Sequence, residues 1–131
     1  MRPHVWKEGE IFVFGSNLDG IHGAGAALFA RQHCGAELGV GEGLTGQSYA
    51  LPTCKHPGIP LTYYEVSWAI DRFINFAQRR LDLQFFVTRV GCGLAGFTDT
   101  EIAYQFSNLP SNLRLPPEWD GLDFESYRKT I

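Results

Sequence analysis

The stretch from Phe85 to Asp99 places the strongest constraint on the fold, because it joins an apolar run, a glycine cluster and a helix start. The apolar residues of 85–90 occupy both parities, which predicts a strand buried on both faces. Thr98 and Glu101 have the spacing of a capping box, so a helix is predicted to follow Thr98. A loop between strand and helix is typical of α/β proteins, where it binds ligands, anions above all.

The glycines of this loop allow three interpretations. Gly91, Gly93 and Gly96 fit the spacing of the dinucleotide-binding fingerprint, which normally opens a fold and is followed about 20 residues on by an acid ending a second strand. Here the glycines begin at residue 91 of 131, and prolines follow from residue 110, which disfavours that fingerprint. The glycines could also serve only a tight turn with positive φ. A second loop of the same kind favours a ligand-binding role.

That second loop follows the apolar run at residues 11–14, which predicts a first buried strand. Residues 23–27 are all glycine or alanine and, with His22 before them, lead into a helix that we expect to stop near Gly35. Two glycine loops suit a ligand with two phosphates, because backbone amides can hold a diphosphate without a lysine. Asn17, at the end of the first strand, is a candidate to orient a ribose hydroxyl. Its alternative role is that of a turn residue bonded to its own backbone.

Composition limits the class of protein. With 131 residues, 44% hydrophobic and 14% aromatic, the chain suits one domain, with a core at about 10–115 and a polar tail at 116–131. A net charge of −3 without a basic run argues against tracking a nucleic-acid backbone and against an anionic membrane surface. No apolar stretch reaches the roughly 18 residues of a membrane helix, and the start lacks the apolar core of a signal peptide, so we expect a cytoplasmic protein.

The three cysteines, Cys34, Cys54 and Cys92, are widely spaced and form no CxxC pair. Neither a zinc site nor a disulfide framework is indicated, and we expect free thiols. The sequence implies no metal and no cofactor.

The rest of the chain completes a three-layer α/β fold with a central mixed sheet flanked by helices. We expect a strand at 47–52 ended by proline, a loop at 53–60, a long amphipathic helix at about 62–80 and a short last strand at 112–115. The glycine-rich stretch 35–46 is either a functional loop or a spacer. Strands 11–14 and 85–90 are predicted to be adjacent, and the aromatic residues of the tail to pack onto the body.

Four stretches, in chain order, resemble the macrodomain family, whose members bind ADP-ribose and in many cases hydrolyse its linkages. Residues 12–17 resemble its first strand, which ends in an asparagine near the distal ribose, and residues 23–27 its glycine-rich helix start. Residues 47–52 resemble the strand that ends in leucine and proline, and residues 93–97 the diphosphate loop. The nearest likeness is to the branch that contains the terminal ADP-ribose glycohydrolase.

The resemblance implies a macrodomain-like fold and a nucleotide ligand, either ADP-ribose, a similar nucleotide diphosphate or an ADP-ribosylated macromolecule. That branch uses a lysine just after the middle strand and an acid just after the glycine-cysteine-glycine-leucine run. Lys55 stands near the lysine position, Ala95 stands at the acid position, and Asp99 is the nearest acid beyond the loop. Lys55 and Asp99 are therefore the candidate catalytic pair, and we expect measurable binding with slow or absent turnover.

The predicted ligand pocket lies between the two glycine loops, with Phe97 flanking a ribose. Its candidate binding residues are Asn17, Gly23, Ala24, Gly25, Gly91, Cys92, Gly93, Leu94, Ala95, Gly96 and Phe97.

Two alternatives remain open. One is a non-catalytic module that binds a nucleotide, which Ala95 favours. The other is a hydrolase in which the Cys92 thiol, with a pKa lowered near a helix start, acts as nucleophile and His22 or His56 as base. In the plain structural interpretation, Cys92 is a small buried residue.

Overall fold

The computed structural model describes residues 4–107 and 109–130, which form a mixed α/β fold around one sheet. The strands are β1 Ile11–Asn17, β2 Gly43–Thr45, β3 Ser48–His56, β4 Ile59–Pro60, β5 Phe85–Val87 and β6 Leu113–Arg114. The helices are α1 Gly25–His33, α2 Tyr63–Gln78, α3 Asp99–Ala103, the 3₁₀ helix η1 Pro117–Trp119 and α4 Phe124–Arg128. The strand order is β2-β3-β1-β5-β6, with β4 paired to β3.

The central strands are parallel and buried on both faces, as the sequence predicts. β1 pairs in parallel with β3 on one side and with β5 on the other, and β5 pairs in parallel with β6. β2 and β4 run antiparallel to β3, which makes the sheet mixed.

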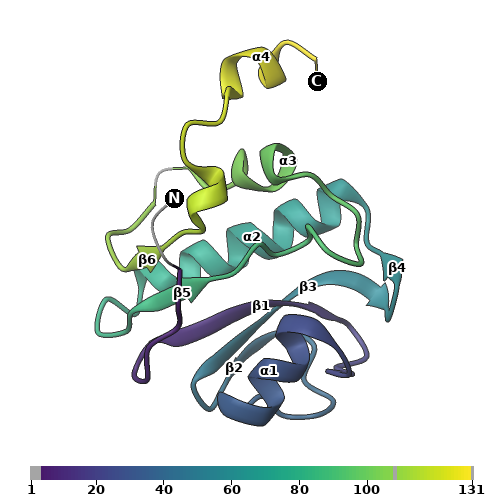
Figure 1. Ribbon diagram of the computed structural model, residues 1–131, viewed down its shortest axis with the longest axis vertical. Coiled ribbons are helices and arrows are strands. Elements are labelled where there is room, and N and C mark those ends of the chain that lie inside the picture. The colour runs from purple at the N-terminus through teal and green to yellow at the C-terminus, as the bar shows by residue number, and fades with distance from the viewer. Residues whose placement is uncertain (1–3, 108, 131) are drawn as a thin grey trace.

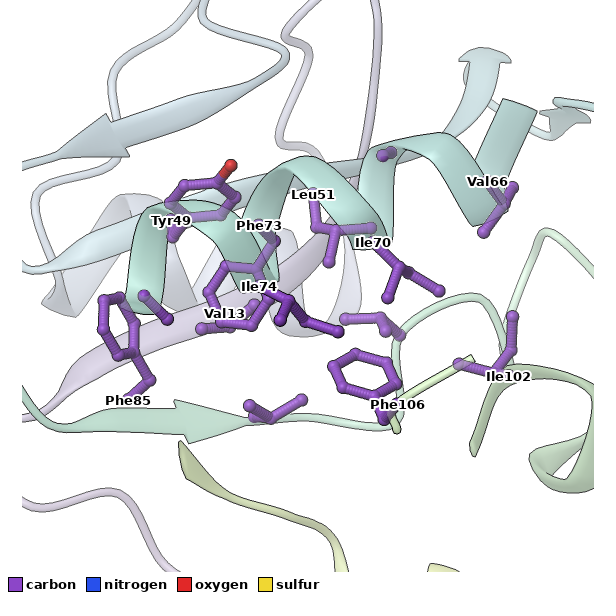
Figure 2. Close-up of a cluster of buried hydrophobic side chains, with 14 of the residues drawn as sticks. Val13, Tyr49, Leu51, Val66, Ile70, Phe73, Ile74, Phe85, Ile102 and Phe106 are labelled. Carbon is purple, nitrogen blue, oxygen red and sulfur yellow. The ribbon is translucent and has the colours of Figure 1, made fainter. Parts of the chain in front are cut away.

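Alternate residues of the strands face opposite layers, which accounts for apolar residues on both parities. Val13 and Phe85 belong to the core cluster on the α2 side, where Figure 2 shows them with the side chains of α2. Phe12 and Phe86 belong to a second cluster with Ala30 of α1. Figure 1 shows α1 and α2 on opposite sides of the sheet, so the fold has three layers.

The long amphipathic helix is confirmed as α2. Thr62 Oγ1 accepts a hydrogen bond from Glu65 N at 3.2 Å, and Glu65 Oε1 accepts one from Thr62 N at 2.9 Å, which fixes the helix start by a capping box. The apolar stripe expected on this helix is buried, apart from the half-buried Phe76, and the structure adds Ile74 to it. The other members of the stripe are Val66, Ala69, Ile70, Phe73 and Ala77. Arg72 and Arg79 are exposed, as expected of a solvated face.

Two strand predictions need correction. β3 does not end at Pro52 but continues to His56 and turns back through β4. Proline lacks the N–H that a ladder requires, and Pro52 lies between the residues of β3 that pair with β2 and those that pair with β4, where that side of β3 has no partner strand. The predicted strand 85–90 is shorter, because after Val87 the chain leaves the ladder and starts the glycine loop.

The stretch 35–46 and the tail both have structural roles. A Cβ on Gly41 would lie 2.5 Å from Asn17 O and one on Gly20 would lie 2.3 Å from Gly39 C, so this stretch packs against the loop after β1, and its end forms β2. In the tail, Trp119 is buried 5.1 Å from the Phe106 ring. The other two tail aromatics also pack onto the body, as predicted.

Candidate ligand-binding site

A cavity of about 550 Å³ lies where β1, β3 and β5 end. Its wall consists of residues 15–17, 21, 23–27, 53–54, 57–58 and 88–95. Parallel strands end at the same edge of a sheet, so the loops that follow them meet there. The volume lies within the range of small-molecule sites. Of the predicted binding residues, all line this cavity except Gly96 and Phe97.

Gly23 and Gly93 lie on opposite loops of the cavity, and nothing in the fold requires glycine at either position. Neither has a positive φ, and a Cβ built on either meets no atom within 4 Å. Both residues line the cavity. A side chain at either position would therefore meet open space beside the cavity, and neither backbone conformation requires glycine.

The backbone amides around these glycines are unpartnered in the part of the chain that the structure describes. Gly23 and Ala24 on one loop, and Gly93, Leu94 and Ala95 on the other, donate no hydrogen bond to residues 4–107 or 109–130. The first turn of α1 also lacks a side-chain cap, whereas α2 and α3 each have a capping box. Unpartnered amides of this kind attract anions.

The turn interpretation holds for the other glycines of the motif. Gly25, Gly91 and Gly96 have positive φ values of 56°, 77° and 82°, a conformation that only glycine adopts without strain. Gly91 is also crowded, because a Cβ there would lie 3.0 Å from Ile102 Cδ1.

Phe97 does not flank the cavity, contrary to the prediction. Its amide donates to Gly91 O at 2.9 Å, which closes the loop, and its ring packs against the core 6.3 Å from the ring of Tyr63. The expected helix-end anion site is also absent at α3: this helix has only five residues, and its start is occupied by Thr98 and Glu101.

Asn17 lines the cavity, but its side-chain amide closes the loop after β1. Nδ2 donates to Ile21 O at 2.8 Å, and Oδ1 accepts from Ile21 N at 3.0 Å. This is the turn role that the sequence left as an alternative. Contact with a ribose hydroxyl stays a prediction, for which the second Nδ2 hydrogen is the available donor.

The predicted catalytic pair is not brought together in the cavity wall. Lys55 is exposed at the end of β3, and its neighbours Thr53 and Cys54 line the cavity instead. The sequence predicts a loop at Thr53, because proline at position 52 is expected to end the strand.

Asp99 is bound to Arg89. Arg89 Nε and Nη2 donate to the two carboxylate oxygens at 2.9 and 2.6 Å, and Trp119 Nε1 donates to Asp99 Oδ1 at 2.8 Å. The hydrogen bonds from Arg89 lower the pKa of Asp99, so this carboxyl is ionised and poorly suited to give up a proton near neutral pH. Arg89 itself lines the cavity, a role that the sequence did not single out.

The alternative of a Cys92 nucleophile loses support. Burial raises the pKa of the Cys92 thiol to about 12, opposite to the lowering that a nucleophile needs. Of the two proposed bases, His22 is buried with Nε2 3.1 Å from Glu37 O. His56 lies on the surface, with Nδ1 2.7 Å from Asp19 Oδ2.

A second cavity, of about 640 Å³, adjoins the first, and sequence reasoning missed it. Its wall contains five aromatic rings, those of His4, Trp6, Phe12, Phe29 and Phe86. The His4 ring stacks on Phe86 at 4.0 Å, and Phe12 lies 4.9 Å from Phe29. These residues come from the N-terminal segment, β1, α1 and β5, so no local pattern in the sequence marks them as one group.

The two cavities are contiguous, because Gly25, Ala26, Thr88 and Arg89 line both. An aromatic cavity of this kind suits a flat ring, which gains from stacking and from the burial of its faces.

Among residues 4–107 and 109–130, no group of three or more histidine, cysteine, aspartate or glutamate side chains is placed to hold a metal ion. No helix in the same residues is long and apolar enough to cross a membrane. Comparison with protein-family models, curated proteins and solved structures found no match to this chain.

Proposed function

We propose that the chain is a macrodomain-like protein that binds ADP-ribose or a related nucleotide diphosphate in the cavity between its two glycine loops. The observation that carries this proposal is the open space at Gly23 and Gly93, which the fold itself does not need. A ligand that fills this space would lie against the backbone of both loops.

The diphosphate would lie between the loops. Gly23 and Ala24 on one side, and Gly93, Leu94 and Ala95 on the other, offer amides without partners among the described residues. Such amides can stabilise phosphate oxygens by hydrogen bonds without a lysine. The lack of any lysine in the cavity wall, within the part of the chain that the structure describes, is consistent with this mode.

The base of the nucleotide would occupy the aromatic cavity. A phosphate held between the loops and a base stacked on aromatic rings belong to one molecule only if the two spaces connect. They connect through Gly25, Ala26, Thr88 and Arg89. This arrangement favours a nucleotide over inorganic diphosphate, because the base adds burial of apolar and aromatic surface.

Binding is better supported than hydrolysis. Lys55 lies outside the cavity wall, and Asp99 is held by Arg89 and Trp119. We therefore propose a module that binds free ADP-ribose or an ADP-ribosylated macromolecule, with slow or no turnover.

Calorimetric titration of ADP-ribose into wild type and Gly93→Leu tests the proposal. The leucine side chain would project into the cavity, and the affinity should fall at least about 100-fold, or about 2.8 kcal/mol. The melting temperature should stay close to wild type, since a Cβ at Gly93 meets no atom within 4 Å and the φ of this residue is not positive. Asn75→Leu, on the exposed side of α2, is the matched control and should bind as wild type does. Equal affinity in Gly93→Leu and wild type would refute the placement of the ligand.

A further inference from the structure

Arg89 lies at the junction of the two cavities, where any ligand that spans them must pass. Within residues 4–107 and 109–130, it is the only charged side chain in the wall of the first cavity. The second cavity adds only His4 and Glu118 as ionisable groups in its wall, within the same residues. A site otherwise built from backbone and small side chains thus has one fixed positive charge.

The guanidinium is held in place and still has a free edge. Nε and Nη2 donate to Asp99 at 2.9 and 2.6 Å, and Nε lies 3.9 Å from Glu118 Oε2. Nη1 donates to no residue of 4–107 or 109–130. The side chain is 47% exposed. A planar guanidinium fixed along one edge presents its remaining N–H groups in one direction.

We infer that Arg89 is the residue that selects the ligand by its charge, with Nη1 donating to a phosphate oxygen at the junction of the two cavities. The inference rests on the proposed function and extends it: it names the side chain that distinguishes a phosphorylated nucleotide from a nucleoside. Asp99 acts here as the competing counter-ion of Arg89. It keeps the guanidinium in place and cancels part of its charge.

A purely structural role for the ion pair makes a different prediction. Arg89 and Asp99 lie at the two ends of the glycine loop, so their pairing could serve only to close it. In that case the loss of either partner should weaken ligand binding to a similar extent. If Arg89 binds the phosphate, the two losses act in opposite directions. Removal of Arg89 removes a donor to the anion, whereas neutralisation of Asp99 removes a nearby negative charge.

The experiment compares wild type, Arg89→Gln, Asp99→Asn and the control Arg72→Gln by calorimetric titration. Arg72 forms an equivalent exposed pair with Glu42, with bonds of 2.6 and 3.0 Å, and lines neither cavity. The probes are ADP-ribose, ADP, adenosine and inorganic diphosphate.

We expect Arg89→Gln to lower the affinity for ADP-ribose and for ADP about 10- to 100-fold, the usual effect of losing a hydrogen bond to a charged group. The affinity for adenosine should differ by no more than about twofold between wild type and Arg89→Gln, because adenosine carries no phosphate. Asp99→Asn should raise the affinity for ADP-ribose about threefold, because one carboxylate charge near the anion is lost. Arg72→Gln should match wild type throughout. If Arg89→Gln is unstable, Arg89→Lys replaces it, with a smaller loss of about three- to tenfold for ADP-ribose alone.

Three results would overturn the inference: equal ADP-ribose affinity in Arg89→Gln and wild type, equal weakening by Arg89→Gln and Asp99→Asn, or an equal loss for adenosine. If wild type binds inorganic diphosphate but neither ADP-ribose nor ADP, the proposed function is wrong. In that case the role of Arg89 in phosphate binding stands only if Arg89→Gln no longer binds diphosphate. If wild type binds no phosphate compound, both proposals are wrong.

Discussion

Glycines two positions apart in one loop have different physical roles. Gly91 is buried, has a φ of 77° and lies close to Ile102, so the fold requires it. Gly93 has no positive φ and faces open space. The sequence shows two glycines and cannot show which φ each adopts, because φ depends on how the loop returns to Phe97.

This difference predicts opposite outcomes for two alanine variants. Gly91→Ala should lower the free energy of unfolding by about 1–3 kcal/mol, through a strained backbone and contact with Ile102. Gly93→Ala should leave the free energy of unfolding unchanged or raise it by up to about 0.5 kcal/mol, because alanine restricts the unfolded chain. Urea denaturation followed by circular dichroism measures both. Similar losses in the two variants would show that the loop has another conformation in solution.

At the scale of secondary-structure elements, Asn112 joins α2 to the sheet. Its buried Nδ2 lies 3.1 Å from Ala77 O and 3.0 Å from both Arg80 O and Leu83 O, where α2 ends and the chain turns into β5, so its two N–H groups are shared among three carbonyls. Asn112 directly precedes β6. Ala77 O and Arg80 O also accept backbone bonds from Arg80 N and Leu83 N, so Asn112 adds a second donor to these two carbonyls and supplies the donor to Leu83 O.

Asn112→Leu should therefore lower the free energy of unfolding by about 1–3 kcal/mol, because Leu83 O loses its donor and Ala77 O and Arg80 O each keep only a backbone donor. Asn75→Leu, at an exposed position of α2, is the control and should stay within about 0.5 kcal/mol of wild type. Chemical denaturation gives both values. A loss at Asn112 no larger than that of the control would show that water satisfies these carbonyls.

Some elements of the fold can be predicted from local sequence patterns, and others depend on contacts between distant parts of the chain. β1, β5 and α2 follow from local patterns, since apolar runs and a 3.6-residue stripe are encoded in consecutive residues. The extent of β3 does not, because Pro52 is tolerated where it lies, in the gap between the residues that pair with β2 and those that pair with β4. Arg89 belongs to the predicted strand 85–90, and no local pattern marks it as a site residue, because its importance depends on where the loop carries it, at the junction of two cavities.

At the scale of the whole molecule, neither candidate catalytic side chain lines the first cavity. The cavity lies where β1, β3 and β5 end, while Lys55 is exposed beyond it and Asp99 is paired with Arg89. We therefore predict that release of ADP-ribose from glutamate-linked ADP-ribosylated protein is slow or absent, although the free ligand binds. Mass spectrometry of the released nucleotide measures this rate. Rapid release that is lost in Lys55→Ala would show that Lys55 reaches the ligand and that the protein is a hydrolase.

The central claim is that the two glycine loops hold a nucleotide diphosphate, and titration of ¹⁵N-labelled protein with ADP-ribose, followed by amide NMR shifts, tests it most directly. We predict saturable shifts concentrated at residues 23–27 and 88–95, with smaller shifts at the aromatic cavity. Adenosine should shift the aromatic cavity and leave Gly93 and Leu94 nearly unchanged. The absence of shifts at millimolar ADP-ribose, or shifts that cluster away from both loops, would contradict the claim.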